Sequence, residues 1–301
     1  MEKKRIIICG AGAIGIFLGA KLNANGHEVI LFGRRKLKAV KSAGDKVKIN
    51  GKEFEIPNHI YHLPKKESYD FVFIASKLYD FDKIVKLINK NKLKANFFAA
   101  IQNGLVDCSK YKKYLNNKKL IPIVVFGGFK LEKNNLTDSS TSIGWKIEKS
   151  REGNSISQLI SSSGVPCKPD KKIESIRAEK MIVNCCLNVL SAIENKSFRQ
   201  LFSKEKTFNR IIALFNESYS ILSKEYSLDN KEKLKKEFIS AWKNVNHYSS
   251  TYQDLKSGRK SEIDFFNGHL IKLAKRYNLS AEENKRIIRD FKRRKNKKKK
   301  K

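Results

Sequence analysis

Three polar residues spaced four apart could do chemistry in the second half of the chain. Lys180, Asn184 and Asn188 share one face if this stretch is helical, and the residues between them are mostly aliphatic. Asparagine is a mediocre helix former, so two asparagines in line with a lysine favour a polar stripe that faces a cleft. An ammonium group there could stabilise and protonate a developing oxyanion. A stripe that faces solvent is the alternative, although Lys and Glu would be more typical of such a face in this chain.

A glycine-rich motif near the beginning of the chain predicts a dinucleotide site. Residues 10–15 read GAGAIG, with a β-branched run before them at 5–9, an apolar stretch of helical spacing at 16–22 and a second strand-like run at 27–32. In the G-x-G-x-x-G motif the glycines permit a tight turn, close approach of a pyrophosphate and close helix–strand packing. A turn without a ligand, or a signal peptide, fits this strand–turn–helix–strand unit less well. The cofactor-binding residues predicted here are Gly10, Ala11, Gly12, Ala13, Ile14 and Gly15.

The residues after the second strand select between nicotinamide cofactors. A site for NAD usually carries Asp or Glu here, bonded to the ribose 2′-hydroxyl, whereas this chain reads Gly33-Arg34-Arg35. Arginine suits a 2′-phosphate, so the sequence predicts NADP(H) with Arg34 at the phosphate. The alternative is that these are two further basic residues in a basic protein.

The elements that must position these residues predict an α/β fold. Strand-like runs alternate with a helical run at 79–89, which indicates a Rossmann-type, doubly wound parallel sheet. Ligands of such sheets bind beyond the carboxyl ends of the strands, and Lys77 and Asn103 lie at such ends. The alternative is that both are ordinary loop residues. A hairpin is expected at 46–56 on Asn50-Gly51. The strand-like runs are 69–75, 96–101 and 120–126, and 141–147 is expected to pair beside the last.

The pattern becomes helical in the second half of the chain. No strand-like run follows Glu174, and two prolines within 166–170 mark a boundary. The sequence therefore predicts a Rossmann NADP-binding domain at 1–169, an all-helical substrate domain at 170–291 and a disordered basic tail at 292–301. Helices are expected near 174–195, 205–226, 231–248, 259–277 and 280–292.

Composition bounds the class of protein. The formal net charge is +34, of which residues 292–301 carry nine positive charges. Nucleic-acid binding is one interpretation, but no recognition motif accompanies the charge, and codon bias of an AT-rich genome explains it more simply. No apolar run reaches the length of a membrane span, and the five cysteines and five histidines show no metal-ligand spacing. We expect a cytoplasmic protein without a metal, a membrane partner or a specific nucleic-acid partner, and consider a homodimer.

The motifs together resemble one known family, the ketopantoate reductases (2-dehydropantoate 2-reductases). The resemblance spans roughly residues 5–290, and its later signature, S-S-x-x-Q-D followed by E-I-D-x-x-N-G, is fairly specific. It implies an N-terminal Rossmann domain and a C-terminal helical domain that enclose NADPH and ketopantoate. The residues that carry it are GAGAIG at 10–15, Lys77, Gln102-Asn103-Gly104, KMIVNC at 180–185, Asn188, Ser249-Ser250 with Gln253-Asp254, and Glu262-Ile263-Asp264 with Asn267-Gly268.

The resemblance also implies roles for matching positions. Lys180 would be the general acid that protonates the ketone oxygen while NADPH delivers hydride to C2, giving pantoate for pantothenate and coenzyme A synthesis. Arg34 and the glycine turn would hold NADPH, with Lys77 and Asn103 near its reacting end. Glu262 would hold cofactor or substrate hydroxyl groups. The substrate-binding set would be Asn103, Lys180, Asn184, Asn188 and Ser250.

Three positions depart from the family pattern and bear on the substrate. Ala178 stands where a tryptophan is usual, His247 where an asparagine is common, and the stretch at 126–129 is less polar than usual. The alternatives are therefore a reductase of the same fold for another 2-oxo acid, or a non-catalytic basic protein associated with nucleotides or RNA. Composition alone does not decide the roles of Glu262 and Asp264, because both could be first-turn acids that complement a helix dipole.

Overall fold

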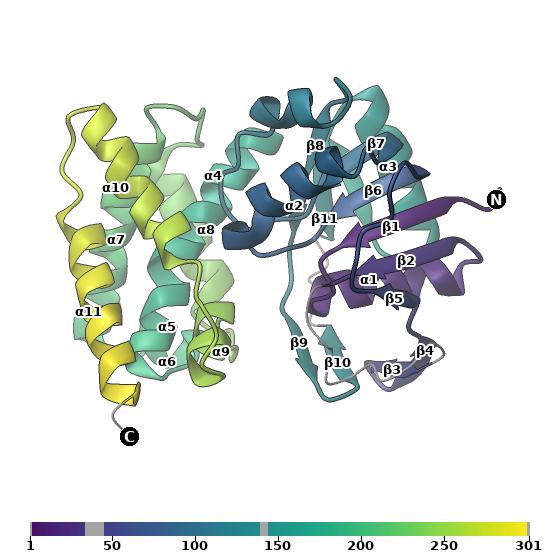
Figure 1. Cartoon of the computed structure of the whole chain (residues 1–301). Helices are drawn as coiled ribbons and strands as arrows, with labels where there is room; N and C mark the ends of the chain where they lie inside the picture. The colour runs from purple at the N-terminus through teal and green to yellow at the C-terminus, as the bar shows by residue number, and fades with distance from the viewer. Residues whose placement is uncertain (1, 34–44, 139–143, 300–301) are drawn as a thin grey trace. The chain divides into compact units, whose positions relative to one another are not determined.

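The computed structural model describes residues 2–33, 45–138 and 144–299 (Figure 1). The chain divides into two compact units, Met1–Ile173 and Glu174–Lys301. The domain boundary expected after residue 169 lies four residues before this division.

The first unit is built on an eight-stranded sheet. Its strand order is β12-β11-β8-β7-β6-β1-β2-β5. The six strands from β5 to β8 pair in parallel, as expected of a doubly wound sheet, and their order is that of a Rossmann fold. At the far edge β11 is antiparallel to β8, so the sheet is mixed there. The strands are β1 (Arg5–Cys9), β2 (Glu28–Phe32), β5 (Asn58–Ile60), β6 (Ser68–Ile74), β7 (Lys94–Ala100), β8 (Leu120–Val125), β11 (Trp145–Glu148) and β12 (Cys167–Asp170).

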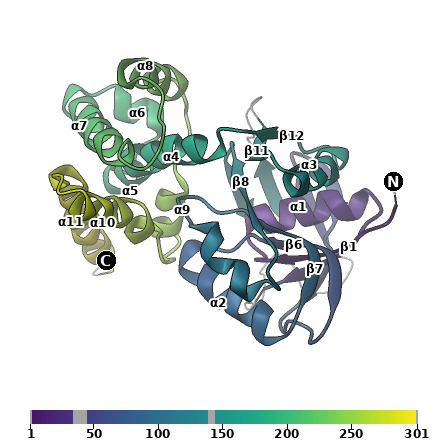
Figure 2. The ribbon, with the colours of Figure 1, turned by 90° about the horizontal axis from the view of Figure 1, so that it is seen from above.

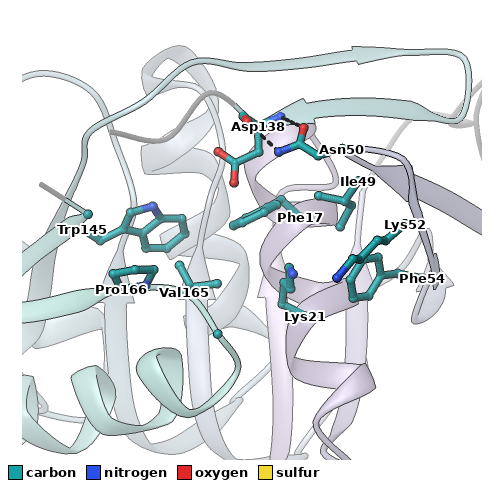
Figure 3. Close-up of a pocket in the computed structure, with 12 residues that line it drawn as sticks. Phe17, Lys21, Ile49, Asn50, Lys52, Phe54, Asp138, Trp145, Val165 and Pro166 are labelled. Carbon is teal, nitrogen blue, oxygen red and sulfur yellow. Dashed lines mark hydrogen bonds between the residues drawn. The ribbon is translucent and has the colours of Figure 1, made fainter. Parts of the chain in front are cut away.

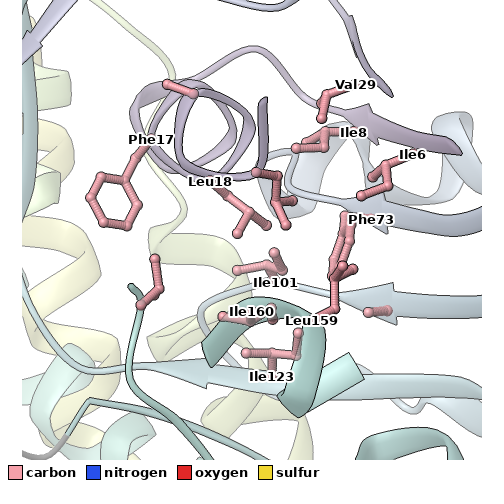
Figure 4. Packing of buried hydrophobic residues seen from close by; sticks show 14 of the residues in the cluster. Ile6, Ile8, Phe17, Leu18, Val29, Phe73, Ile101, Ile123, Leu159 and Ile160 are labelled. Atoms are coloured by element: carbon pink, nitrogen blue, oxygen red, sulfur yellow. The ribbon is translucent and has the colours of Figure 1, made fainter. Parts of the chain in front are cut away.

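Helices cover both faces of this sheet (Figure 2). Ile6 and Ile8 of β1 point into the core under α1 (Ala13–Ala24) and α3 (Arg151–Ser162), where Figure 4 shows them beside Leu18 and Phe73. The alternate residues Ile7 and Cys9 face the opposite core, under α2 (Leu78–Lys90) and a 3₁₀ turn (Cys108–Tyr114). Full burial of each isoleucine contributes about 1.5–3 kcal/mol. The β-branched run therefore fixes β1, and with it the position of the glycine turn that follows.

A smaller sheet packs beside α1 in the same unit. Its order is β4-β3-β10-β9, from β3 (Lys46–Ile49), β4 (Lys52–Glu55), β9 (Phe129–Glu132) and β10 (Asn135–Asp138). The hairpin predicted on Asn50-Gly51 is confirmed, with positive φ angles of 46° and 87° at the two turn residues. The β9–β10 hairpin carries no comparable turn signal and was not expected.

The second unit is helical in its described part, as predicted. Its elements are α4 (Ile173–Val183), a π-helical turn (Asn184–Asn188), α5 (Val189–Glu194), α6 (Phe198–Phe202), α7 (Glu205–Leu222), α8 (Lys231–Trp242), α9 (Ser250–Lys256), a 3₁₀ turn (Ile263–Phe265), α10 (Asn267–Arg276) and α11 (Glu282–Lys299). The helix expected over 259–277 begins only at Asn267, after the 3₁₀ turn. No helix of the described residues is long and apolar enough to cross a membrane.

The basic C-terminal segment differs from the expectation of disorder from residue 292. Helix α11 continues to Lys299, past its last buried apolar residue, Phe291. Lys and Arg are good helix formers, and extending an existing helix requires no new nucleation. These two effects outweigh the repulsion between like charges that favoured disorder in the sequence.

Candidate active site

The glycine turn joins β1 to α1 and has the geometry of an anion cradle. Gly10 has a φ of +135°, and a Cβ there would lie 2.5 Å from the backbone of Ala75. A Cβ on Gly15 would lie 1.9 Å from the carbonyl oxygen of Gly10. A Cβ on Gly12 would meet nothing within 4 Å, so the space beside it is open. Gly12 begins α1 without a side-chain cap or an acidic first turn, which leaves donor N–H groups for a phosphate.

Polar groups gather at the neighbouring strand ends of the same sheet. The strand order reverses between β1 and β6, which is where doubly wound sheets bind ligands. Lys77 follows β6 as the residue before α2, and Asn103 follows the adjacent β7. Gln102 donates from Nε2 to the carbonyl of Ile74 at 2.6 Å, and this bond ties the two strand ends together. Gln102 Oε1 and Ser76 Oγ are buried and have no partner in the described part of the chain, which marks this edge as a polar site.

The end of β2 approaches the glycine turn closely. A Cβ on Gly33 would lie 2.7 Å from Ala11 Cβ and 3.0 Å from His59 Nε2, so this position accepts only glycine without movement. Partial burial lowers the pKa of His59. Arg34, predicted to bind the 2′-phosphate, lies outside the described residues, as does Arg35.

The predicted polar stripe of the second unit contains a buried pair of amides. Asn184 and Asn188 are the first and last residues of the π-turn, and Asn188 Nδ2 donates to Asn184 Oδ1 at 2.8 Å. Their exposed fractions are 4% and 8%, which excludes the solvent-facing alternative for these two residues. Asn184 Nδ2 has no hydrogen-bond partner within the described ranges. The pair therefore retains one buried donor that is not used within the described part of the chain.

Ser249 connects α9 to the π-turn. Its Oγ donates to the carbonyl of Asn188 at 2.7 Å and accepts from Tyr252 N at 3.0 Å, so one hydroxyl caps α9 and holds its first turn against the amide pair. Its backbone N–H donates to Ser191 Oγ at 3.3 Å. Ser250, the first residue of α9, is thereby fixed next to this junction.

Lys180 lies on the last turn of α4, immediately before the π-turn, and is half-buried. Burial lowers the pKa of Lys180 to about 8, while the nearby Glu262 carboxylate opposes the shift. Glu262 is itself buried and precedes the 3₁₀ turn, so it is not a first-turn acid of a long helix. A lysine with this pKa can give up its proton near neutral pH, as a general acid must.

The first unit contains a pocket of about 200 Å³ (Figure 3). It is lined by α1, the smaller sheet and the segment before β12, with Phe17, Trp145 and Lys21 among its walls. Asn50 Nδ2 donates to the carbonyl of Asp138 at 2.8 Å and closes one side. None of the predicted site residues lines this pocket, so it does not belong to the candidate site.

Comparison with known proteins identifies the family. The family model "Ketopantoate reductase PanE/ApbA" matches residues 6–145, and the model "Ketopantoate reductase PanE/ApbA C terminal" matches residues 172–295. The chain belongs to the ketopantoate reductase family. The family is one of oxidoreductases, and the resemblance drawn from the motifs is confirmed.

Relatives of known name match nearly the whole chain. A 2-dehydropantoate 2-reductase from Archaeoglobus fulgidus is 24% identical and the match covers 96% of this chain and 97% of the relative. A PanE/ApbA family ketopantoate reductase from Ralstonia eutropha has a TM-score of 0.83 at 20% identity, covering 98% of this chain and 99% of its own. A D-mandelate dehydrogenase, solved with NADH and anilino(oxo)acetate, has a TM-score of 0.85 at 20% identity, covering 97% and 98%. These structures confirm the fold.

The predicted site residues fall into two groups, one in each unit. The glycine turn, Lys77 and Asn103 share the carboxyl edge of the large sheet, and Asn184, Asn188 and the junction beside Ser250 gather around the π-turn. Sequence reasoning gave no role to His59 or Ser76, because neither belongs to a motif. It also missed the π-turn, because the side chains that donate to its carbonyls, Ser249 and Asn267, lie far along the chain.

Proposed function

We propose that the chain is an NADPH-dependent reductase that converts 2-dehydropantoate (ketopantoate) to pantoate, a step of pantothenate and coenzyme A synthesis. Family membership supports the reaction class. The observation that carries the proposal is the polar set around the π-turn, where a lysine of lowered pKa precedes a buried amide pair with a spare donor. An apolar helix accommodates such a set at a cost in stability, which a binding role explains.

The proposed chemistry assigns each side chain one task. Bound NADPH supplies the hydride that adds to C2 of the 2-oxo acid, and the electron pair of the carbonyl bond moves to oxygen. The Lys180 ammonium stabilises this developing oxyanion and protonates it, leaving a neutral amine that takes its proton back from water. Asn184, Asn188 and Ser250 hold substrate oxygens, and Glu262 holds hydroxyl groups of substrate or cofactor.

The residues of the first unit fit a dinucleotide. Gly10 and Gly15 are required by packing, and the open space beside Gly12 leaves room for the pyrophosphate on the N–H groups of α1. We assign Lys77 and Asn103 to the nicotinamide end. We propose NADP(H) rather than NAD(H) because Gly33-Arg34-Arg35 contains no carboxylate for a ribose 2′-hydroxyl.

A second candidate is reduction of a different 2-oxo acid. One solved structure of the same fold is a D-mandelate dehydrogenase. Ala178 and His247 also stand where the family usually carries larger or amide side chains. Both observations concern the substrate and leave the reaction type unchanged.

The deciding experiment measures NADPH oxidation by the purified protein with a panel of 2-oxo acids. Turnover should be fastest with ketopantoate. Faster turnover with another member selects the second candidate, and retained NADPH binding without turnover on any member selects a non-catalytic, nucleotide- or RNA-associated protein. Light scattering of the same sample tests the homodimer, and fractionation of the native cells tests the cytoplasmic location.

A further inference from the structure

The π-turn depends on hydrogen bonds from outside its own helix. It interrupts what would be one helix from α4 to α5, and one extra residue in a turn leaves a carbonyl without its usual i+4 donor. Two carbonyls of the turn accept side-chain donors instead. Asn267 Nδ2 donates to Cys185 O at 3.1 Å, and Ser249 Oγ donates to Asn188 O.

Asn267 belongs to a buried network that the proposed chemistry does not use. It is the first residue of α10, is fully buried, and also donates from Nδ2 to Asn284 Oδ1 at 2.9 Å. Asn284, buried near the start of α11, donates from both its backbone N and Nδ2 to Glu217 Oε1 of α7, each at 2.8 Å. Glu217 Oε2 accepts from Glu283 N at 3.0 Å. Three helices thus fix one amide against the π-turn.

This network has a steric consequence for the amide pair. Each residue of an α-helix turns the chain by about 100°, so a π-turn rotates every following side chain relative to an uninterrupted helix. Lys180 precedes the turn, whereas Asn188 follows its extra residue. The relative direction of the lysine and the second asparagine is therefore a property of the π-turn. If the Asn267 amide were removed, Cys185 O and Asn284 Oδ1 would both lose the hydrogen bond that Asn267 Nδ2 donates. The π-turn would then lose a hydrogen bond that stabilises it from outside its own helix.

We propose that Asn267 is a positioning residue: it holds the π-turn that orients Asn184 and Asn188 toward the 2-oxo acid. This inference rests on the proposed function for its substrate, and on the hydrogen bonds above for its geometry. Asn267 touches neither substrate nor cofactor in this role, so its loss should affect binding of the 2-oxo acid more than proton transfer.

The test replaces Asn267 by leucine, which has similar volume and no amide. The KM for the 2-oxo acid should rise roughly ten- to a hundredfold, because the hydrogen bonds that Asn184 and Asn188 are proposed to make with the charged substrate would be weakened. The kcat should change by less than about threefold, because Lys180 is held by α4, and the KM for NADPH by less than about twofold. Asn267→Gln keeps the donor and should restore part of the KM.

A matched control is available in the other unit. Asn91 Nδ2 donates to the carbonyl of Leu63 at 3.0 Å, the same kind of bond far along the chain from the π-turn. Asn91→Leu should lower the melting temperature without changing either KM. If Asn267→Leu behaves in the same way, Asn267 is merely structural and the inference is wrong.

Two further measurements keep the inference testable. If Asn267→Leu does not fold, Asn284→Ala takes its place. This variant keeps the hydrogen bond from Asn267 to Cys185 O but removes the one from Asn267 to Asn284, and it should raise the KM for the 2-oxo acid by roughly fivefold. Hydrogen exchange of the amides at 185–190 should be faster in either variant than in the parent, and this readout needs no turnover. If hydrogen exchange at 185–190 is the same in the variants as in the parent, the inference about Asn267 is wrong, even when the parent is active. If the parent turns over none of the 2-oxo acids, the proposed function is wrong, and the exchange rates alone then test the role of Asn267.

Discussion

Asn188 Nδ2 donates a hydrogen bond of 2.8 Å to Asn184 Oδ1, and this bond fixes which way the Asn184 amide points. With Oδ1 engaged, Nδ2 of Asn184 is turned away from Asn188, and it has no partner among the described residues. A buried donor without an acceptor costs about 1–3 kcal/mol. In the proposed function, a carboxylate or ketone oxygen of the substrate would accept this hydrogen bond.

Asn184→Leu tests that arrangement. The variant should raise the KM for the 2-oxo acid by roughly tenfold or more, because a hydrogen bond to a charged group contributes about 1.5–3 kcal/mol. Steady-state kinetics with saturating NADPH measure this. Asn216→Leu is the matched control, since Asn216 Oδ1 is also buried without a partner in the described part of this unit but lies on α7 outside the site. Equal KM values for the two variants would contradict a substrate role for Asn184.

Lys180→Ala tests the general acid. Turnover should fall by about 10²–10⁴-fold, the usual contribution of a positioned proton donor. NADPH binding, measured by calorimetry, should persist because its phosphates are assigned to the glycine turn of the other unit. Lys275→Ala removes an exposed lysine of α10 and should leave turnover unchanged. A loss below about threefold in a folded, NADPH-binding Lys180→Ala protein would remove the proposed proton donor.

The lowered pKa of Lys180 predicts two opposite dependences on pH. A general acid must be protonated, so kcat/KM should decline as pH rises through about 8. Stability should move the other way: between pH 8 and the ordinary value of 10.5 the unfolded chain binds more protons at this lysine than the folded one. The free energy of unfolding of the parent should therefore increase across this window relative to Lys180→Met, as urea titrations at several pH values would measure. A parallel course for the two proteins would show that Lys180 is not desolvated.

Much of the fold was predictable because local and tertiary preferences agree. The run Ile6-Ile7-Ile8 is β-branched and buried on both faces of the sheet, so it reads as a central strand from sequence alone. Asn50-Gly51 forms the predicted hairpin because both residues take the positive φ angles that the turn requires. In contrast, β12 (Cys167–Asp170) contains a proline and is stabilised by its edge position beside β11, which only the folded structure supplies.

Candidate site residues could be selected from the sequence where residue type carries the information. Lys180, Asn184 and Asn188 stand out because polar residues are rare in an apolar helix. The π-turn does not stand out, because hydrogen bonds to Cys185 O and Asn188 O come from residues more than 60 positions away in the chain. Glu262 was selected as a candidate, but its position before a short 3₁₀ turn was not predicted, since a helical pattern spans 259–277 in the sequence and the break before Asn267 has no proline or glycine.

Deletion of residues 292–301 should leave the enzyme intact. The last apolar side chains that α11 is described as burying are Ile287 and Phe291, and the residues described after them, 292–297, are exposed. Turnover and melting temperature should stay close to those of the parent, while salt-sensitive retention on immobilised nucleic acid should weaken because nine positive charges are lost. A large loss of activity would show that the end of α11 contributes to the site or to an assembly.

Cofactor preference should depend on the pair Arg34 and Arg35, which come shortly after β2 in the sequence. A guanidinium binds a 2′-phosphate through two parallel hydrogen bonds, and charged hydrogen bonds contribute about 1.5–3 kcal/mol. Arg34→Ala should therefore weaken NADPH binding by roughly ten- to a hundredfold and leave NADH binding nearly unchanged.

Because Arg35 can substitute in part, the double alanine variant is the decisive protein, with Lys46→Ala as a control for the general loss of positive charge. Calorimetry with both dinucleotides gives the ratio of affinities. If the double variant still prefers NADPH as strongly as the parent, the 2′-phosphate is bound elsewhere, and His59 beside Gly33 becomes the next residue to replace.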